Sequence, residues 1–256
     1  MLVYSVYISL SGLNQCLDKN FQENEIIEKQ VLQNKEGEMI DFKIPDETKA
    51  IRDKVRDFVQ SECHPAEENC TAENFDEVLA GLRKTARSQG LWCPFVPEEH
   101  GGMGLRPLAN ALVQMELGES FLGALALNTQ GPDDATMLTL LEHGTDFQKE
   151  KFLKPLLNGE KRICYSMTEK AAGADATGMQ TKAELEGDEW VLNGEKWFSS
   201  SASVADIAVV MAKTDPDAAR HEQYSTFIVE LPNPGYNILR NIETMQPHTE
   251  LGLKLG

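Results

Sequence analysis

The 256-residue sequence lacks the common motifs of nucleotide-binding and hydrolytic enzymes. It contains no GxGxxG, no GxxxxGK[ST], no HExxH and no GxSxG, and the segment GGMG at 101–104 does not extend into a dinucleotide fingerprint. A nucleotide cofactor, if the protein binds one, is therefore not held by a Rossmann turn.

Basic residues are scarce. The 24 Lys and Arg stand against 41 Asp and Glu, which gives a formal net charge of −17. Such a surface repels phosphate backbones and anionic membranes, so we expect no nucleic-acid partner, although a local loop of backbone N–H groups can still hold a small phosphate-bearing ligand. No apolar run is long enough for a membrane span, and the first residues lack the positive charges of a secretory signal or a transit peptide.

The five cysteines are few, odd in number and irregularly spaced. There is no CxxC, and Cys63 and Cys70, with His64 between them, do not have zinc-site or redox spacing. We therefore expect no metal site and reduced thiols, which is typical of an intracellular protein. The sequence leaves the compartment open between the cytoplasm and the mitochondrion.

The polar and acidic segment 1–40 reads as an atypical N-terminal extension, and residues 41–160 then show helical periodicity. Pro45, with acidic residues after it and apolar residues at helical spacing, predicts a helix over 45–60, and a second helix is predicted to end at Gly90. Further helices are predicted over three segments: 108–120, 133–144 and 146–159.

The pattern changes to alternation after Lys161, so residues 161–256 are expected to form a β-domain. The predicted strands are 162–169, 179–187, 189–200, 206–214 and 224–231, with turns at 186–189, 193–196 and 233–235. Asn193–Gly194 is the strongest hairpin signal among them. The predicted fold class is α+β and multidomain: an all-α N-terminal domain followed by an antiparallel β-barrel or sandwich. Because no clear closing strand follows, we expect the β-domain to be incomplete and the chain truncated.

Two stretches of the β-domain suggest a ligand site. At the end of the strand RICYSMTE, Met167 and Thr168 can offer backbone groups and a hydroxyl, and the loop AAGADATG at 171–178 allows close backbone approach to a phosphate. In KWFSSS, alternation places Trp197 and Phe198 on opposite faces, so that one ring is core and the other can cover a flat ligand. The alternative is a small-residue loop whose turns are capped by Thr168 and Asp175, beside a hydrophobic strand.

Taken together, these stretches resemble the acyl-CoA dehydrogenase family. The resemblance covers about residues 41–245 in colinear order, and its motifs are closest to the branch that some eukaryotes fuse to a kinase-like domain. It rests on five segments: FKIPDETKAIRDKVRDFV (42–59), GLWCPFVPEEHGGMGL (90–105), GTDFQKEKFLKPLLNGEKRICYSMTE (144–169), TEKAAGAD (168–175) and NGEKWFSS (193–200).

The resemblance implies FAD as the cofactor, gripped between the two stretches. The residues that it assigns to cofactor binding are Tyr165, Met167, Thr168, Gly173, Ala174, Phe198, Ser199 and Ser200. Phe198 stands where Trp is usual in the family and Ser200 where Thr is usual. Ala174 replaces a common Ser that helps to hold the cofactor or CoA phosphates, and Lys170 stands in place of a usual Pro.

For the substrate, the resemblance implies an acyl-CoA thioester that is oxidised to the 2-enoyl-CoA. Thr136, Met137 and Leu140 are candidate pocket residues beside Ala174, with core packing the alternative for Met137 and Leu140. The family's base is a Glu on a C-terminal helical bundle that this sequence does not contain, so no catalytic residue is assigned, and Glu169 is assigned to the cofactor loop. The electron acceptor would be a flavoprotein or oxygen, and the full-length family is homo-oligomeric.

Three functions remain open at this stage. The chain is a fragment of an FAD-dependent acyl-CoA dehydrogenase, a related flavoprotein such as an acyl-CoA oxidase or nitroalkane oxidase, or a non-catalytic truncated paralogue that acts through a partner. For the chain on its own we expect weak or absent FAD binding and no turnover.

Overall fold

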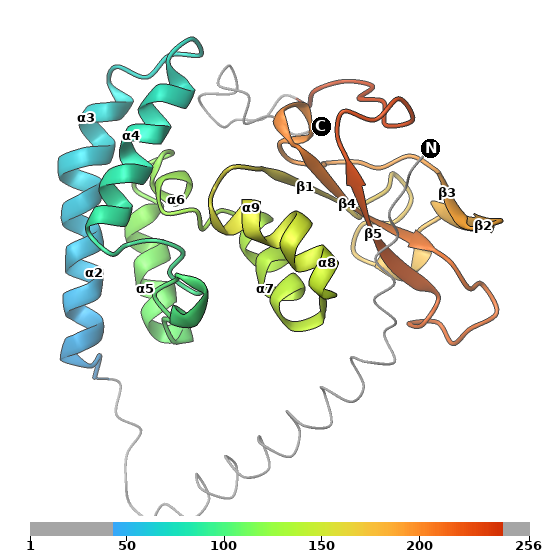
Figure 1. The fold of residues 1–256 in the computed structure, drawn as a ribbon, viewed down its shortest axis with the longest axis horizontal. Helices are drawn as coiled ribbons and strands as arrows, with labels where there is room; N and C mark the ends of the chain where they lie inside the picture. Colours follow the sequence, from blue (N-terminus) through green and yellow to red (C-terminus); the bar gives the residue numbers. More distant parts are fainter. Residues whose placement is uncertain (1–42, 243–256) are drawn as a thin grey trace, which may run out of the picture.

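The computed structural model describes residues 43–242. Helices form the first part of this range and a sheet forms the second, with β1 crossing from one to the other (Figure 1). The helical order is α2 (Asp46–Phe58), α3 (His64–Glu67), α4 (Phe75–Ser88), α5 (Pro107–Leu117), α6 (Gly123–Ala126), α7 (Asp133–His143), α8 (Asp146–Gln148) and α9 (Lys154–Leu157), with 3-10 turns at Glu98–His100, Ala176–Gly178 and Ala202–Val204. The predicted extension at 1–40 lies outside the described residues, and the predicted domain boundaries stay a prediction.

Two helices are continued through a π turn. Val59–Cys63 joins α2 to α3, and Lys149–Leu153 joins α8 to α9. Each π turn ends two residues before a proline, Pro65 or Pro155. Because proline has no N–H and its ring clashes with the carbonyl four residues earlier, the preceding turn widens while the helix continues.

The helix ends follow from local chemistry. Thr145 and Gln148 form a capping box at the start of α8, in which each side chain bonds the other's backbone N–H. After α4 the chain reverses at Gly90 with φ +69, and after α9 it reverses at Gly159 with φ +65, which glycine adopts without steric cost.

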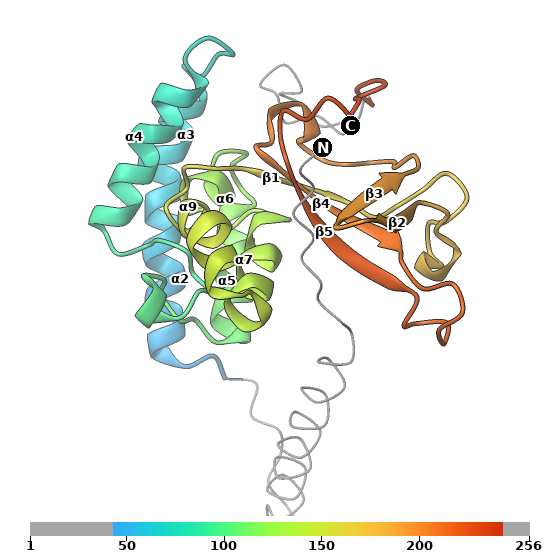
Figure 2. The same ribbon diagram turned by 45° about the vertical axis from the view of Figure 1, so that its right-hand side comes forward.

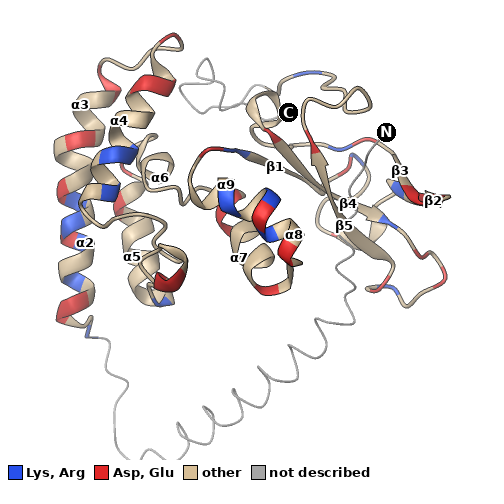
Figure 3. Ribbon diagram, in the orientation of Figure 1, with Lys and Arg blue, Asp and Glu red and all other residues tan. Residues whose placement is uncertain are grey.

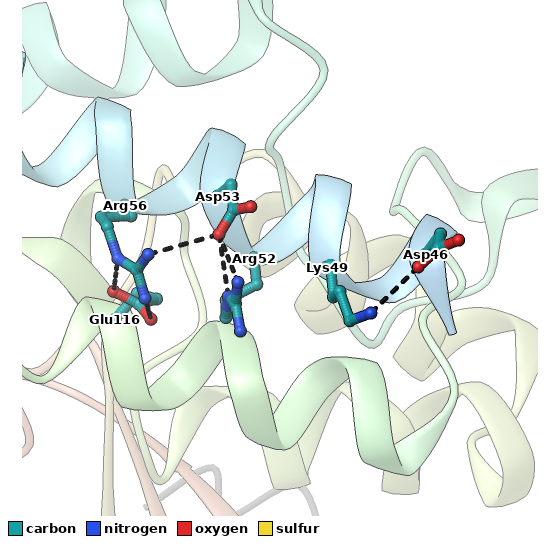
Figure 4. A network of polar contacts seen from close by, with 6 residues as sticks. All are labelled: Asp46, Lys49, Arg52, Asp53, Arg56 and Glu116. Carbon is teal, nitrogen blue, oxygen red and sulfur yellow. Dashed lines mark hydrogen bonds and ion pairs between the residues drawn. The ribbon is translucent and has the colours of Figure 1, made fainter. Parts of the chain in front are cut away.

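Figure 3 shows that Asp, Glu, Lys and Arg alternate along α2. On the side that meets α5, Arg56 forms a two-pronged contact with Glu116, with Nε–Oε2 at 2.9 Å and Nη2–Oε1 at 2.7 Å (Figure 4). Asp53 accepts from both Arg56 and Arg52, which extends the network along the helix. These exposed contacts set the register of α2 on α5, whereas the apolar core beneath supplies most of the stability.

The sheet contains β1 (Ile163–Ser166), β2 (Lys182–Glu186), β3 (Glu189–Asn193), β4 (Ile207–Lys213) and β5 (Tyr224–Glu230). β4 pairs parallel with β1 and, through one residue pair, with β2; the β2–β3 and β4–β5 pairs are antiparallel. The predicted order of a helical domain followed by a β-domain is confirmed. The detail of an antiparallel barrel or sandwich needs correction, because the sheet of the described residues is mixed and open. The forty residues between β1 and β4 form a connection long enough for the two strands to run parallel.

A second apolar core joins the helices to the sheet. In both views, α7, α8 and α9 lie between the remaining helices and the strands (Figures 1 and 2). The buried members of this core come from both parts: Trp92, Cys93, Val96, Met137, Leu140, Phe152, Leu153, Leu156, Ile163, Ile207, Val209 and Ile228. This core fixes β1, and therefore the loop that follows it, against the helical layer.

We expect Phe152→Ala to lower the free energy of unfolding by about 3–5 kcal/mol, because the ring is fully buried between helix and sheet and its removal leaves a cavity. Phe147→Ala, five residues earlier and 56% exposed, is the matched control and should change it by less than about 1 kcal/mol. Urea unfolding of the two variants checks this; equal losses would contradict a core at this interface.

Candidate functional site

The structure places the two predicted site stretches side by side. The Trp197 N–H donates to the Thr168 carbonyl at 2.8 Å, and the hydroxyls of Ser166 and Ser199 lie 2.8 Å apart. We call residues 166–169 and 196–199 the paired segments. Their contacts bring Thr168 next to Trp197, the immediate neighbour of Phe198, so backbone groups from one segment and an aromatic ring from the other lie in one place.

The second paired segment is not the strand that the sequence predicts over 189–200. β3 ends at Asn193, and the chain then runs irregularly, with left-handed φ values of 58° at Phe198 and 65° at Ser201. The hairpin between β2 and β3 turns at Gly187, with φ +66, inside the turn predicted at 186–189, and there is no hairpin at Asn193–Gly194. The hairpin and strand predictions at these positions are therefore wrong, because contacts with residues distant in sequence determine this segment.

Gly194 has a different role from a turn residue. A Cβ at this position would lie 2.3 Å from the Thr181 hydroxyl oxygen and 2.7 Å from its Cα. The glycine therefore lets the chain leaving β3 pass directly against Thr181, just before β2, and this close approach directs Lys196 and Trp197 towards β1.

A buried ion pair ties the paired segments together. The Lys196 ammonium donates to Glu169 Oε1 at 2.8 Å and to the Met167 carbonyl at 2.9 Å. Glu169 also accepts from the backbone N–H groups of Gln180 (2.6 Å) and Thr181 (2.9 Å). The Lys196 and Glu169 side chains are only 10% and 7% exposed, so this pair fixes the loop after β1, the start of β2 and the second paired segment to one another.

The same contacts decide the protonation of Glu169. Burial raises the pKa of this carboxyl, but the hydrogen bonds from Lys196 and from the two backbone N–H groups outweigh it and lower the pKa from 4.5 to about 2. Burial lowers the pKa of Lys196, although the attraction of Glu169 opposes this shift. A carboxylate so strongly held is a poor general base, which agrees with its assignment to the cofactor loop.

The loop after Glu169 presents small residues to solvent. Glu169 and Ala172 exchange two backbone hydrogen bonds of 3.1 Å in a tight turn, and Gly173 and Ala174 follow as exposed residues. Asp175 accepts from the Thr177 N–H at 3.0 Å and pairs with Arg220 at 2.7 Å. The capping role in the alternative interpretation is thus found for Asp175, which anchors the far end of the loop to the β4–β5 connection.

The paired segments leave specific groups available for a ligand. The Met167 and Thr168 carbonyls already accept from Lys196 and Trp197, whereas within the described residues the Thr168 hydroxyl has no hydrogen-bond partner. The Phe198 ring is 47% exposed and meets the Trp197 ring edge-on at 5.6 Å. Ser200, two residues after Phe198 along the chain, is half-buried. We call this arrangement the cradle.

Other predicted residues lie elsewhere. The Tyr165 side chain packs against the helix–sheet core, and Ser199 faces Ser166, so the side chains of these two residues are not part of the open cradle surface. On α7, Met137 and Leu140 are buried in the helix–sheet core, as the packing alternative expects. Thr136 is 7% exposed, and its hydroxyl donates to the Pro132 carbonyl at 3.1 Å.

Sequence reasoning missed a polar cluster behind the cradle. The Ser166 hydroxyl lies 3.3 Å from the Tyr236 hydroxyl as well as 2.8 Å from that of Ser199. Burial raises the pKa of Tyr236 to about 12, so this phenol stays protonated and can donate. These groups line a cavity of about 370 Å³ between the sheet and residues 233–242. No local pattern joins Ser166 to Tyr236, which lies 70 residues further along the chain.

Further findings limit the chemistry of the site. Across residues 43–242, no three His, Cys, Asp or Glu side chains lie together as a metal site would require. No helix in this range is long and apolar enough to cross a membrane.

Comparison with known proteins is consistent with this geometry. The family model "Acyl-CoA dehydrogenase, N-terminal domain" matches residues 45–160, and "Acyl-CoA dehydrogenase, middle domain" matches residues 164–254. The chain therefore belongs to the acyl-CoA dehydrogenase family.

Individual relatives match over most of the described residues. Acyl-CoA dehydrogenase family member 11 of Gallus gallus is 36% identical over 202 residues, which is 73% of this chain but 26% of that protein. A Mycobacterium abscessus protein described as an acyl-CoA dehydrogenase superposes with a TM-score of 0.76 at 31% identity, over 84% of this chain and 57% of the other. The Bacillus anthracis acyl-CoA dehydrogenase complexed with FAD superposes with a TM-score of 0.61 at 30% identity. The match covers 83% of this chain and 35% of the other. The chain thus spans about a quarter of the length of the Gallus gallus relative.

Gly194→Ala should destabilise the protein by about 1–3 kcal/mol, because the new methyl group collides with the backbone of Thr181 as well as with its side chain. Gly81→Ala in α4, where nothing lies within 4 Å, is the control and should be neutral or stabilising by up to about 1 kcal/mol. Thermal unfolding of both variants checks the close approach; an unchanged Gly194→Ala variant would refute it.

Glu169→Gln should lower the free energy of unfolding by about 3 kcal/mol at neutral pH, since it leaves the Lys196 charge buried without its partner. Because the folded pKa of Glu169 lies below the unfolded value, its contribution is complete above pH 4.5 and is lost as the pH falls towards about 2. The difference in the free energy of unfolding between wild type and variant, measured with urea, should therefore be smaller at about pH 3 than at neutral pH. Glu150→Gln, which breaks an exposed pair with Lys154, should cost under about 1 kcal/mol and show no comparable pH dependence.

Proposed function

We propose that the cradle binds the ring system of FAD and that the protein contributes this cradle to an acyl-CoA dehydrogenase. One observation carries the proposal: the paired segments are locked together by the Lys196 and Trp197 contacts, while the Thr168 hydroxyl and the Phe198 ring stay open beside them. An open hydroxyl and an exposed aromatic ring on two segments that are bonded to each other suit a flat heterocycle with polar edges.

The loop fits the phosphate part of such a cofactor. A Cβ on Gly173 would meet nothing within 4 Å, and Gly173 and Ala174 are exposed, so a phosphate could approach their backbone N–H groups. Ala174 contributes no hydroxyl, so any phosphate binding there depends on backbone donors.

The proposed reaction is removal of hydrogen from the α and β carbons of an acyl-CoA thioester, for which bound FAD would supply the hydride acceptor. In this division of labour, Thr168 orients the ring by its hydroxyl, and Phe198 covers one side and excludes water. The carboxylate beside the cradle, Glu169, is held by Lys196 and two backbone donors, so we propose that the base for the α-proton comes from outside residues 43–242.

FAD titration of the purified chain tests the cradle. Thr168→Val removes the open hydroxyl and Phe198→Ala removes the covering ring, and each should weaken FAD binding about 3- to 10-fold through loss of roughly 1 kcal/mol. The readouts are the dissociation constant from quenching of flavin fluorescence and the shift of the visible flavin spectrum on binding.

Two controls on the helical part match these variants. Thr139→Val removes a hydroxyl that donates to the Ala135 carbonyl, and Phe147→Ala removes another exposed ring; neither should change FAD affinity. Equal affinity of wild type, Thr168→Val and Phe198→Ala would overturn the cradle. Bleaching of the flavin absorbance by an acyl-CoA would show instead that the chain supplies its own base.

A further inference from the structure

A second hollow lies at the opposite end of β1 from the cradle. Its volume is about 710 Å³, within the range of small-ligand sites, and it lies between α4, the turn at 158–160, Arg162 and residues 204–206. The cradle follows Ser166, whereas this hollow borders Arg162, so the two sites are separated by the length of β1 and share none of their residues. We call it the α4 groove.

Four cations line the α4 groove in a chain whose net charge is −17. Arg83, Lys84 and Arg87 come from the second half of α4, and Arg162 comes from the residue before β1. Figure 3 shows this change of sign along α4, with acidic residues at its start and basic residues towards its end.

The three α4 cations are not neutralised by carboxylates. Arg83 donates to the carbonyls of Leu125 (3.2 Å) and Gly159 (2.6 Å), and Arg87 donates to the carbonyl of Asn158 (2.7 Å). Within the described residues, no carboxylate lies within ion-pair distance of these arginines, and Lys84 has neither an ion pair nor a hydrogen bond. Carbonyl acceptors satisfy the N–H groups but leave the charges in place.

The electrostatics of Arg83 reflect this concentration of charge. Burial lowers its pKa, and repulsion from Arg162 and Arg87 lowers it further, whereas the attraction of Asp133 raises it. The result is a pKa of about 10. Like charges held together in a partly buried groove favour a bound anion, which would relieve their repulsion.

The acidic residues of the groove are already engaged. Asp76 pairs with the Arg162 guanidinium at 2.9 Å, and Asp206 accepts from the Arg162 backbone N–H at 2.9 Å. Glu160 accepts from the Asn158 amide at 3.0 Å. Asp76 is paired with Arg162, whereas Glu160 and Asp206 bond to neutral N–H donors and keep their negative charge. The lining therefore carries four cations against three carboxylates, with three of the cations on the second half of α4.

Basic residues near a helix C-terminus also stabilise the helix dipole. That explanation accounts for Arg87 in the last turn of α4. It does not account for Arg162, which reaches the same groove from another element, or for the hollow between them. Arg87 in addition stacks on Trp92, with its guanidinium carbon 3.5 Å from the ring centroid, which holds the side chain at the groove.

We propose that the α4 groove binds a phosphate group of a small soluble molecule. Guanidinium groups match phosphate oxygens with paired N–H donors, and the flexible Lys84 ammonium can close on the same anion. The net negative charge of the chain opposes docking on an anionic membrane, which favours a soluble phosphate source.

Calorimetric titration of the full chain with inorganic phosphate and with pyrophosphate tests the proposal. Lys84→Gln should weaken pyrophosphate binding about 3- to 10-fold without loss of stability, because within residues 43–242 this side chain forms no ion pair and no hydrogen bond. Arg87→Gln should weaken it at least as much. Lys182→Gln, an exposed lysine on β2, is the matched control and should bind like wild type.

Three outcomes would overturn the proposal. Lys84→Gln could bind pyrophosphate as tightly as wild type, or sodium chloride at equal ionic strength could stabilise the chain as much as pyrophosphate does. Sedimentation with vesicles containing phosphatidic acid, without binding of soluble pyrophosphate, would point to a lipid headgroup instead. FAD affinity should be unchanged in Lys84→Gln, so failure here and failure of the cradle are distinguishable.

Discussion

The buried ion pair of Glu169 and Lys196 is the contact on which the cradle depends. Lys196 reaches both the Met167 carbonyl and the Glu169 carboxylate, while Glu169 also holds the backbone N–H groups of Gln180 and Thr181. Removing either partner would leave a charge buried without compensation. The ion pair therefore holds the loop, β2 and the second paired segment together. The open groups of Thr168 and Phe198 are positioned by this contact, although neither belongs to it.

The ion pair can act only because β1 is held by its pairing with β4 on one edge and by the helices against which it packs. β1 pairs in parallel with β4 on one edge, and its apolar residues pack on the helices through the core that contains Phe152 and Met137. The end of β1 is therefore fixed before the loop begins. The irregular second segment has no ladder of its own, so Gly194, the Trp197–Thr168 bond and the buried ion pair replace one.

Local chemistry made the helical part predictable. Helices begin or end close to the positions predicted from Pro45 with the acids after it, from Gly90 and from Gly159. The candidate site was predictable as two stretches of residues but not as a geometry. The turn predicted at 186–189 is found at Gly187, but the hairpin predicted at Asn193–Gly194 is absent, because a dipeptide preference is weaker than the fit of Gly194 against Thr181. Parallel pairing of β1 with β4 and the Lys196–Glu169 contact join residues far apart in sequence, and no local pattern encodes them.

The two proposed sites use opposite solutions to binding an anion in an acidic protein. In the cradle loop, Arg220 is paired with Asp175, and the backbone N–H groups of the exposed residues Gly173 and Ala174 are the proposed donors. In the α4 groove, carbonyl acceptors orient Arg83 and Arg87 without neutralising their charge. Binding in the groove should therefore weaken steeply with salt, whereas binding in the cradle, which rests on ring contact and neutral donors, should be less sensitive.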